Sequence, residues 1–451
     1  MSGAVTIGRG TFIGANATVL QGLLVGADTI VGGRCRRNPH SPYECHRHES
    51  PRAMIRPGKS THHSTKPVAV VTATIPITIE KFFREIIRQV QAEGYDICVV
   101  SSPGPELERV RDEMGVRVRS LPMMREISPL ADLVALTRWL RVFLAERPSL
   151  LISATPKASL LSLLAGKVTG VRRRLYCMVG LRLEGEQGRR RQLLTVMERF
   201  TGWASTEVVA NSPSLAARYA DLRLAPRRVL RQTRPGSSHG VDSSYFSPRF
   251  PDLDLARYLG IDRSIPVIGF VGRLTHDKGI DCMTEAMALL HTDGVNCQLL
   301  VVGPQDEPDS AVYLDKLKST GENLFVVGAV EDVRPYYALM DVHVLPSLRE
   351  GFPNVVLEAS AMGLPTVTTD ATGAIDSVRQ DETGLIVKTG DSRGLSEAIK
   401  TLMWDPECRA RFGVAAREWV MADFQPDSVV QSLLAFGEIS GARSSQHVGE
   451  N

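Results

Sequence analysis

The sequence predicts an α/β protein with two doubly wound parallel domains in series, which face a cleft and follow a short left-handed β-helix-like fragment and a linker. From Lys66 onward, short apolar runs typical of buried strands alternate with segments of helical periodicity. This alternation restarts at Pro266, after a junction at residues 243–262 that contains two prolines. Residues 1–33 instead repeat with a period of six. The length of 451 residues leaves room for about two or three domains.

Aliphatic residues recur at every sixth position of the first 33 residues, at Ile7, Ile13, Val19, Val25 and Val31. This period is typical of a left-handed parallel β-helix, in which each of these side chains points into the prism. The stretch resembles the hexapeptide-repeat sugar acyltransferases. It covers fewer than two coils of about 18 residues, whereas repeat folds need about three units for stability. It also lacks a histidine, which those enzymes use as base, so we expect a fragment without acyltransferase activity.

Residues 34–66 have no apolar period and are rich in Arg, His, Pro and Ser, so they are predicted to form a linker. The segment contains seven residues of metal-binding type: Cys35, His40, Cys45, His46, His48, His62 and His63. Their spacing matches no zinc module, and no metal site is predicted here.

Residues 67–245 carry the first alternation of strands and helices. Strands are expected at residues 68–73, 97–100, 116–121, 150–153, 175–179 and 208–210. Helices are expected at residues 79–92, 106–114, 130–145, 158–170 and 193–203, and a further helix is capped by Ser212 with Pro213 in its first turn. Because parallel strands need crossover helices, this alternation predicts a first doubly wound domain.

Residues 262–425 carry the second alternation. Strands are expected at residues 267–271, 298–302, 324–327, 342–345, 366–368 and 385–387. Helices are expected at residues 277–291, 333–340, 355–361, 394–404 and 408–421, and a last helix at 427–438 begins the C-terminal segment 426–451. Two such domains in series form a cleft between facing strand ends, where the ligands of these sheets bind.

The net charge of +3 hides an asymmetry, because residues 67–250 carry +11 and residues 251–451 carry −14. A basic half suggests an anionic partner, for which nucleic acid, a phospholipid surface and a phosphorylated substrate are candidates; a solvated surface without a partner is the alternative. No secretory signal and no run of about 18 uncharged apolar residues is found, so no transmembrane helix is predicted. Seven scattered cysteines fit a reducing cytosol rather than a disulfide framework.

The strongest local motif is REGFPNVVLEA at residues 349–359, which joins a predicted strand to a predicted helix. A helix that begins at a cleft offers free backbone N–H groups and a partial positive charge, which suit a diphosphate. Glu350 lies in the loop and can reach into the cleft. Glu358 lies inside the helix, where its carboxylate can accept hydrogen bonds from both hydroxyls of a ribose.

A second motif, GRLTHDKG at residues 272–279, follows a buried strand and opens a helix. Gly272 allows close backbone approach, and Arg273 and Lys278 can both neutralise phosphate oxygens. The segment is neither a Walker P-loop nor a GxGxxG fingerprint, which argues against nucleotide hydrolysis and dinucleotide binding.

Together these motifs resemble the retaining family 4 glycosyltransferases of the GT-B fold, which has two Rossmann-like domains. The resemblance covers about residues 67–440. It extends to Gly328, to segments of the second domain at residues 341–347 (DVHVLPS), 363–365 (GLP) and 384–387 (GLIV), and to segments of the first at 155–157 (TPK), 212–214 (SPS) and 240–242 (GVD).

The resemblance implies a retaining hexosyl- or N-acetylhexosaminyltransferase with a nucleotide-sugar donor, UDP-linked. Glu350, Arg273 and Lys278 would be catalytic: the two cations would hold the donor diphosphate, and Glu350 would contact the donor sugar. Glu358 would hold the ribose. The implied donor site comprises Gly272, Arg273, Lys278, Glu350, Gly351, Phe352, Pro353, Asn354 and Glu358. Such enzymes need no metal or other cofactor, and no Asp-x-Asp metal signature occurs in the cleft motifs.

On the acceptor side the sequence departs from the family. Many members have a Gly-Gly pair after the first strand and a histidine in the following loops, whereas residues 72–76 (TATIP) and 176–182 contain neither. Lys157, Arg182 and Glu184 are the polar candidates in these loops.

Three segments, at residues 155–158, 180–184 and 373–378, look like those of bacterial enzymes that extend undecaprenyl-diphosphate-linked sugars for surface polysaccharides. The resemblance therefore implies a polyprenyl-diphosphate-linked saccharide as acceptor and no nucleic acid partner. The basic first domain would contact the anionic cytoplasmic face of the membrane peripherally.

Two other functions remain open. A hexapeptide-type sugar acyltransferase would need more coils and a histidine base. A catalytically inactive glycan- or lipid-binding scaffold would not need the two glutamates together with Arg273 and Lys278.

Overall fold

The computed structural model describes residues 66–435, except 125, 306–309, 320 and 322, and four two-residue strands within the first 31 residues. The chain forms two compact units, Met1–His63 and Ser64–Asn451. The first unit contains β1 (Thr6–Ile7), β2 (Phe12–Ile13), β3 (Leu24–Val25) and β4 (Ile30–Val31).

These four strands pair in parallel, β1 with β3 and β2 with β4. Thr6 pairs with Leu24 and Phe12 with Ile30, so partners are 18 residues apart in the sequence. This offset equals the length of one coil in the predicted β-helix, which itself stays a prediction. The linker at residues 34–66, with its cysteines and histidines, lies outside the described residues apart from Lys66.

The first doubly wound domain has a seven-stranded sheet in the order β11-β10-β9-β8-β5-β6-β7. Every neighbouring pair is parallel. The strands are β5 (Val68–Thr72), β6 (Asp96–Ser101), β7 (Arg117–Ser120), β8 (Leu150–Ala154), β9 (Arg173–Met178), β10 (Glu207–Ala210) and β11 (Leu230–Gln232).

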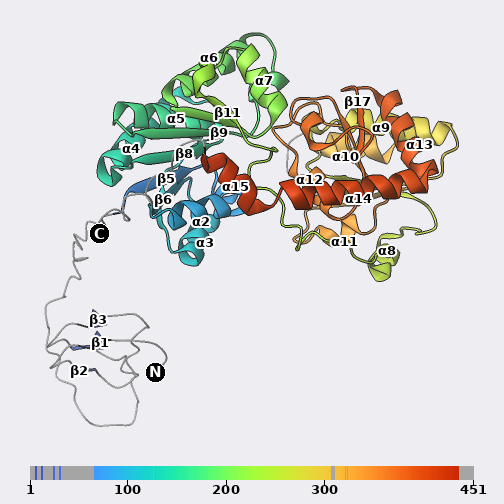
Figure 1. Cartoon of the computed structure of the whole chain (residues 1–451), viewed down its shortest axis with the longest axis horizontal. Helices are drawn as coiled ribbons and strands as arrows, with labels where there is room; N and C mark the ends of the chain where they lie inside the picture. The colour runs from blue at the N-terminus through green and yellow to red at the C-terminus, as the bar shows by residue number, and fades with distance from the viewer. Residues whose placement is uncertain are drawn as a thin grey trace, which may run out of the picture. The chain divides into compact units, whose positions relative to one another are not determined.

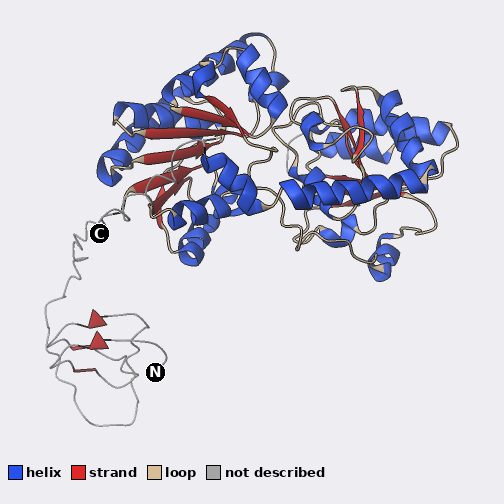
Figure 2. Cartoon of the chain, in the orientation of Figure 1, coloured by secondary structure: helices blue, strands red, loops and turns tan. Residues whose placement is uncertain are grey.

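Helices cover both faces of this sheet (Figure 2). One layer is α4 (Pro129–Glu146), α5 (Pro156–Val168), α6 (Gly188–Ala204) and α7 (Pro213–Asp221); the other is α1 (Pro76–Phe82), α2 (Arg84–Ala92), α3 (Pro105–Met114) and α15 (Pro426–Ala435). Successive residues of a strand point to opposite faces. Accordingly Val70 packs in the core with α4, whereas Ala69 and Val71 pack in the core with α1 and α2.

The second domain has a six-stranded parallel sheet in the order β14-β13-β12-β15-β16-β17. Its strands are β12 (Val267–Val271), β13 (Gln298–Val302), β14 (Leu324–Val327), β15 (Val342–Leu345), β16 (Thr366–Thr369) and β17 (Gly384–Val387). One face packs against α9 (Ile280–Thr292), α10 (Ser310–Lys318) and α13 (Ser392–Trp404). The other packs against α8 (Leu253–Leu259), α11 (Arg334–Tyr337) and α12 (Asn354–Ala361), and α14 (Pro406–Asp423) lies against α12.

The prediction of two doubly wound domains is confirmed. β11 and α10 were not predicted, and three other details differ. The helix predicted at residues 79–92 is two helices, because the chain leaves helical geometry at Phe83. The junction at residues 243–262 contains α8, which is capped by Asp252. The last helix, α15, follows the second domain in the sequence but buries Val430 and Leu433 against the first (Figure 1).

Candidate functional site

A cavity of about 570 Å³ lies between the two sheets, and both domains line it. Its residues from the first domain lie in or just after α1, at the ends of β8, β9 and β10, or in the segment that follows β11. Those from the second domain are Lys278, which follows β12, and residues in and around the first turns of α12. The lining residues are Thr78, Lys81, Phe82, Phe83, Ala154, Thr155, Val179, Asn211, Ser238, His239, Lys278, Glu350, Phe352, Pro353, Asn354, Val355 and Glu358. The carboxyl ends of strands from both sheets thus meet at one place, as doubly wound folds predict.

Lys278 and Glu350 form an ion pair at the wall of this cavity. Lys278 Nζ lies 2.5 Å from Glu350 Oε1, and the side chains are 17% and 12% exposed. Ser347 Oγ donates a second hydrogen bond to the same oxygen, at 2.7 Å. Gly279 fixes the approach of this turn: its φ is 69°, and a Cβ there would lie 1.9 Å from the carbonyl oxygen of Pro346. The pair therefore has a fixed place at the cavity, and within the described part of the chain no hydrogen bond to the other carboxylate oxygen of Glu350 is found.

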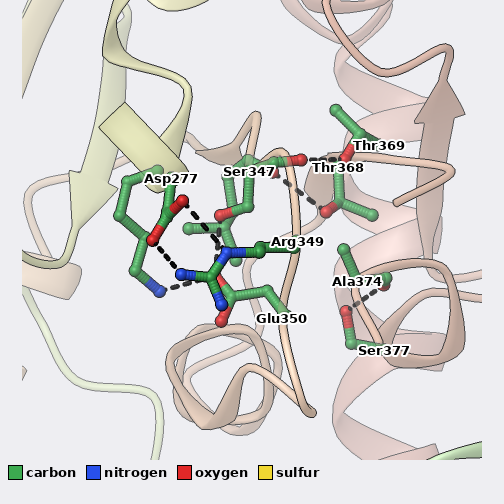
Figure 3. A network of polar contacts seen from close by, with 10 residues as sticks. Asp277, Ser347, Arg349, Glu350, Thr368, Thr369, Ala374 and Ser377 are labelled. Atoms are coloured by element: carbon green, nitrogen blue, oxygen red, sulfur yellow. Dashed lines mark hydrogen bonds and ion pairs between the residues drawn. The ribbon is translucent and has the colours of Figure 1, made fainter. Parts of the chain in front are cut away.

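The loop that carries Glu350 is held by a second ion pair. Arg349 and Asp277 point toward each other beside Glu350 (Figure 3), with Arg349 Nε donating to Asp277 Oδ1 at 3.0 Å and Nη2 to Oδ2 at 2.5 Å. The backbone N–H of Leu348 also donates to the carbonyl of Asp277 at 2.8 Å. Thr369 Oγ1 donates to the carbonyl of Ser347 at 2.5 Å. Such bidentate contacts restrict the loop and hence the position of Glu350.

Helix α12 begins at the cavity. Its first turn contains no acidic residue, and no side chain caps it. A helix start of this kind attracts an anion through its free N–H groups and its partial positive charge. Gly351 lets the preceding loop approach the first domain, because a Cβ there would lie 1.9 Å from the carbonyl oxygen of Val179. The second domain thus places both Lys278 and a helix N-terminus at one wall.

Glu358 lies one turn into α12 and also lines the cavity. Its Oε2 accepts a hydrogen bond from Tyr337 Oη at 3.0 Å. Burial raises the pKa of Glu358 to about 7, although the hydrogen bond from Tyr337 and the charge of Lys81 act in the opposite direction. Lys81 belongs to α1, so a cation of the first domain faces this carboxyl group across the cavity.

Arg273 and Gly272 follow β12 directly but do not line this cavity. Arg273 is exposed, whereas Lys278 is half-buried. Of the nine residues predicted for the donor site, the structure brings six to the cavity: Lys278, Glu350, Phe352, Pro353, Asn354 and Glu358. Gly351 lies in the same loop and contacts the first domain instead.

His239 is a cavity residue that the sequence analysis missed. Its ring lies 4.8 Å from the ring of Phe82, and Asn354 Nδ2 donates to its Nε2 at 2.6 Å. Nδ1 then carries the proton and donates to Ser238 Oγ at 3.0 Å. Burial lowers the pKa of His239 to about 4, so the ring is neutral at physiological pH. The sequence offered one indication of this role: His239 directly precedes the GVD segment (residues 240–242) at the end of the first domain.

The three acceptor-side candidates lie outside the cavity lining. Lys157 is buried, pairs with Asp132 at 2.8 Å and donates to the carbonyl of Glu126. Arg182 is exposed. Glu184 Oε1 accepts hydrogen bonds from Arg218 at 3.0 Å and from Thr372 of the second domain at 3.1 Å. Glu184 therefore connects the two domains at the edge of the cleft.

A second connection between the domains involves Ser214 and Asp376. The backbone N–H of Ser214 donates to Asp376 Oδ2 at 3.0 Å, and the backbone N–H of Gly373 donates to Ser214 Oγ at 2.7 Å. The segment that contains Thr372 and Asp376 also holds the loop of Glu350, because the backbone N–H of Glu350 donates to the carbonyl of Thr372 at 2.8 Å. The described residues contain no group of three or more His, Cys, Asp or Glu side chains that could hold a metal ion.

Comparisons with known proteins match both domains. A family model described as "Glycosyl transferases group 1" matches residues 265–405, and one described as "Glycosyl transferase 4-like domain" matches residues 78–233. A capsular polysaccharide biosynthesis glycosyltransferase, CapM of Staphylococcus aureus, is 32% identical over 367 residues, which are 81% of this chain and 94% of that protein.

A further relative is the N,N'-diacetylbacillosaminyl-diphospho-undecaprenol alpha-1,3-N-acetylgalactosaminyltransferase of Campylobacter jejuni. It is 34% identical over 176 residues, which are 38% of this chain and 45% of that protein. Among solved structures, a glycosyltransferase from Rickettsia africae superposes with a TM-score of 0.68 at 17% identity, over 84% of this chain and all of that one.

Proposed function

This chain belongs to the group 1 glycosyltransferases, and from that premise we propose that it transfers a sugar from a UDP-linked donor, with retention, to a polyprenyl-diphosphate-linked saccharide during surface polysaccharide synthesis. The observation that carries the proposal is the cavity between the domains, where Lys278, Glu350 and the start of α12 meet. An inactive scaffold would have no need for a half-buried charged pair at this place.

The donor diphosphate is proposed to lie between Lys278 and the N-terminus of α12. Both supply positive charge where the leaving group becomes more negative, and fixed charges of this kind stabilise a transition state. The ribose hydroxyls donate to Glu358, whose carboxylate can accept two hydrogen bonds. Glu350 contacts the sugar with the oxygen that Lys278 does not occupy. Arg273, which is exposed beside the cleft, closes on the diphosphate when donor binds.

In the proposed reaction the bond between the anomeric carbon and the diphosphate oxygen breaks. The hydroxyl oxygen of the acceptor forms the new bond on the same face of the sugar. Its proton passes to the departing diphosphate, so no protein base has to hold it. This scheme conserves the anomeric configuration, and it needs the positive charge that the cavity provides more than a nucleophilic side chain.

The acceptor is proposed from the relatives. CapM acts in capsular polysaccharide synthesis, and the name of the Campylobacter enzyme describes a diphospho-undecaprenol acceptor. A lipid-linked acceptor requires access to a membrane surface. None of the described helices is long and apolar enough to cross a bilayer. The proposed acceptor and the net charge of +11 on residues 67–250 support peripheral contact of the first domain with an anionic membrane face.

The test is a matrix of nucleotide sugars and acceptors with the full chain. UDP-linked hexoses and N-acetylhexosamines and GDP-mannose are each combined with a polyprenyl-diphosphate-linked saccharide and with the same saccharide lacking the lipid diphosphate. Mass spectrometry of the products should show one added sugar from a UDP-linked donor. GDP-mannose is included because a GDP-mannose-dependent alpha-mannosyltransferase of Mycolicibacterium smegmatis is 34% identical over 223 residues. Transfer from GDP-mannose alone would show that the donor nucleotide is GDP and not UDP. Absence of transfer in every combination would contradict the proposed activity.

A further inference from the structure

Helix α6 of the first domain exposes a continuous apolar stripe. Leu193, Val196, Phe200 and Trp203 are 47%, 46%, 52% and 57% exposed. Their spacing of three and four residues places them in one row along the helix. The opposite side of α6 is buried against the domain core through Leu194. The stripe is therefore not a misplaced core face but a second, outward apolar face of the same helix.

Arginines surround this stripe. Arg189, at the N-terminal end of the row, is followed by Arg190 and Arg191, and Arg199 lies on its flank; all four are exposed. The first turn of α6 contains no acidic residue. Positive charge at a helix N-terminus opposes the helix dipole unless an anion is present. Among the described residues, Arg190 pairs with Glu186 at 3.0 Å, and neither Arg189 nor Arg191 has an ion pair.

The C-terminal end of the neighbouring helix α5 adds a further cation and a further exposed apolar side chain to this surface. Lys167 of α5 lies 4.1 Å from the ring centroid of Trp203, and the next residue, Val168, is 78% exposed. Exposed tryptophan, phenylalanine and leucine between arginine and lysine side chains match the interfacial zone of an anionic bilayer, which takes up apolar side chains and attracts cations. A protein partner would have to supply both an apolar groove and several acidic groups in register with α6.

We propose that this surface of α6, formed by Arg189, Arg190, Leu193, Val196, Arg199, Phe200 and Trp203, inserts into the headgroup region of an anionic phospholipid membrane. The inference rests on the proposed peripheral attachment and identifies the side chains that make it.

The position of α6 gives this surface a consequence for the acceptor. The turn Arg182–Gly185 leads directly into α6, and within it Glu184 contacts Thr372 at the edge of the cleft. The N-terminal end of α6 therefore lies near the cleft and its arginines lie between the cleft and the apolar stripe. A lipid held beside α6 would have its diphosphate near these arginines and its saccharide toward the cavity.

Tryptophan fluorescence of the full chain tests the surface directly. Of the four tryptophans, Trp203 and Trp404 are exposed, at 57% and 69%, and Trp404 lies in the second domain. The Trp404→Phe protein should shift its emission to shorter wavelength on vesicles of equal parts phosphatidylcholine and phosphatidylglycerol, and brominated acyl chains should quench it. The matched Trp203→Phe protein should show neither change. On phosphatidylcholine alone, both proteins should stay unchanged.

A charge variant provides the second arm. Replacing Arg189, Arg190 and Arg199 with Gln should lower the vesicle partition coefficient about a hundredfold, since each surface cation contributes roughly 1 kcal/mol. Circular dichroism checks that the variant is folded. Binding of UDP to the cavity, measured without acceptor and without vesicles, should stay unchanged because none of these arginines lines the cavity. Loss of UDP binding would count against the donor site, whereas loss of vesicle binding alone would test the α6 surface.

Three results would overturn the inference. Vesicle binding with quenching in the Trp203→Phe protein and none in the Trp404→Phe protein would assign the contact to another surface. Protection of Trp203 from acrylamide before vesicles are added, rising with protein concentration, would show that a second copy covers α6. The same protection at every concentration would show that another segment of the chain covers it.

Discussion

Replacing Lys278 with Met should lower the kcat/KM for the donor strongly. The substitution keeps an unbranched side chain but removes the charge that lies 2.5 Å from Glu350 Oε1. Loss of one charge-assisted contact to the diphosphate costs about 1.5–3 kcal/mol, which is about 10- to 150-fold in kcat/KM. The effect should exceed this range at low salt, because the 12% exposed Glu350 then faces the diphosphate without its partner.

A double variant separates the lost contact between Lys278 and the diphosphate from the repulsion by the unpaired Glu350 carboxylate. In Lys278→Met/Glu350→Gln the unpaired carboxylate is gone, so the donor KM should fall below that of Lys278→Met, whereas kcat stays low because Glu350 no longer contacts the sugar. Glu350→Gln alone should mainly lower kcat. Lys316→Met is the matched control: Lys316 also pairs with a carboxylate, Asp281, but lies outside the cavity.

The assay is initial-rate release of nucleoside diphosphate over a range of donor concentrations, with thermal unfolding recorded for each variant. A kcat/KM for Lys278→Met within about threefold of the Lys316→Met control would correspond to less than about 0.7 kcal/mol and would refute the diphosphate role of Lys278.

Four further predictions follow from the site and the N-terminal unit. Burial raises the pKa of Glu358 to about 7, so the contribution of this carboxyl group to the unfolding free energy should fall as pH rises from 4.5 toward 7. The donor KM should fall over the same pH range, because the carboxylate that binds the ribose forms. Glu358→Gln should remove the first pH dependence in urea unfolding and the second in steady-state kinetics. Gly351→Ala should lower the unfolding free energy by about 1–3 kcal/mol and reduce activity, because its Cβ meets Val179; an unchanged melting temperature would contradict this. His239→Ala should lower kcat/KM about fivefold, since a hydrogen bond that orients Asn354 is worth about 1 kcal/mol, and His239→Asn should retain more activity than His239→Ala in the same assay. Deleting residues 1–59 should leave kcat unchanged, and a folded truncation without activity would show a role for that segment.

The architecture could be predicted from the sequence because the buried strands of a parallel α/β fold consist of short runs of apolar residues. β12, β13 and β15 begin and end where the apolar runs do. β11 was missed because its residues Leu230–Gln232 lack an apolar run. The destination of α15 could not be predicted, because its apolar residues indicate only that it is covered, not by which domain.

The donor side of the cavity was predictable for a similar local reason. Lys278, Glu350 and Glu358 belong to segments that join a strand to a helix, so the fold itself carries them to the cleft. The acceptor side was not predictable. Lys157 and Glu184 had the right residue type and position in the loops, but Lys157 pairs with Asp132 and Glu184 contacts Thr372. Such partners are distant in the sequence and leave no local pattern.

His239 is the opposite case: it lines the cavity, but the motifs did not predict it. A histidine was sought in the loops after the first strands, and the cavity obtains one from the exit of the first domain instead. Residues 237–239 reach the cavity because Asn354, at the start of α12, bonds to both Ser237 and His239. Only the packing of the two domains brings these segments together.

The most direct test of the account is nuclear magnetic resonance of the product formed by the full chain from a UDP-linked α-sugar and a polyprenyl-diphosphate-linked saccharide. The account predicts one α-linked sugar added per UDP released, with the product absent from the Lys278→Met/Glu350→Gln protein. A β-linked product would contradict same-face transfer, and release of UDP with free sugar but no glycosylated acceptor would contradict the assignment of the acceptor.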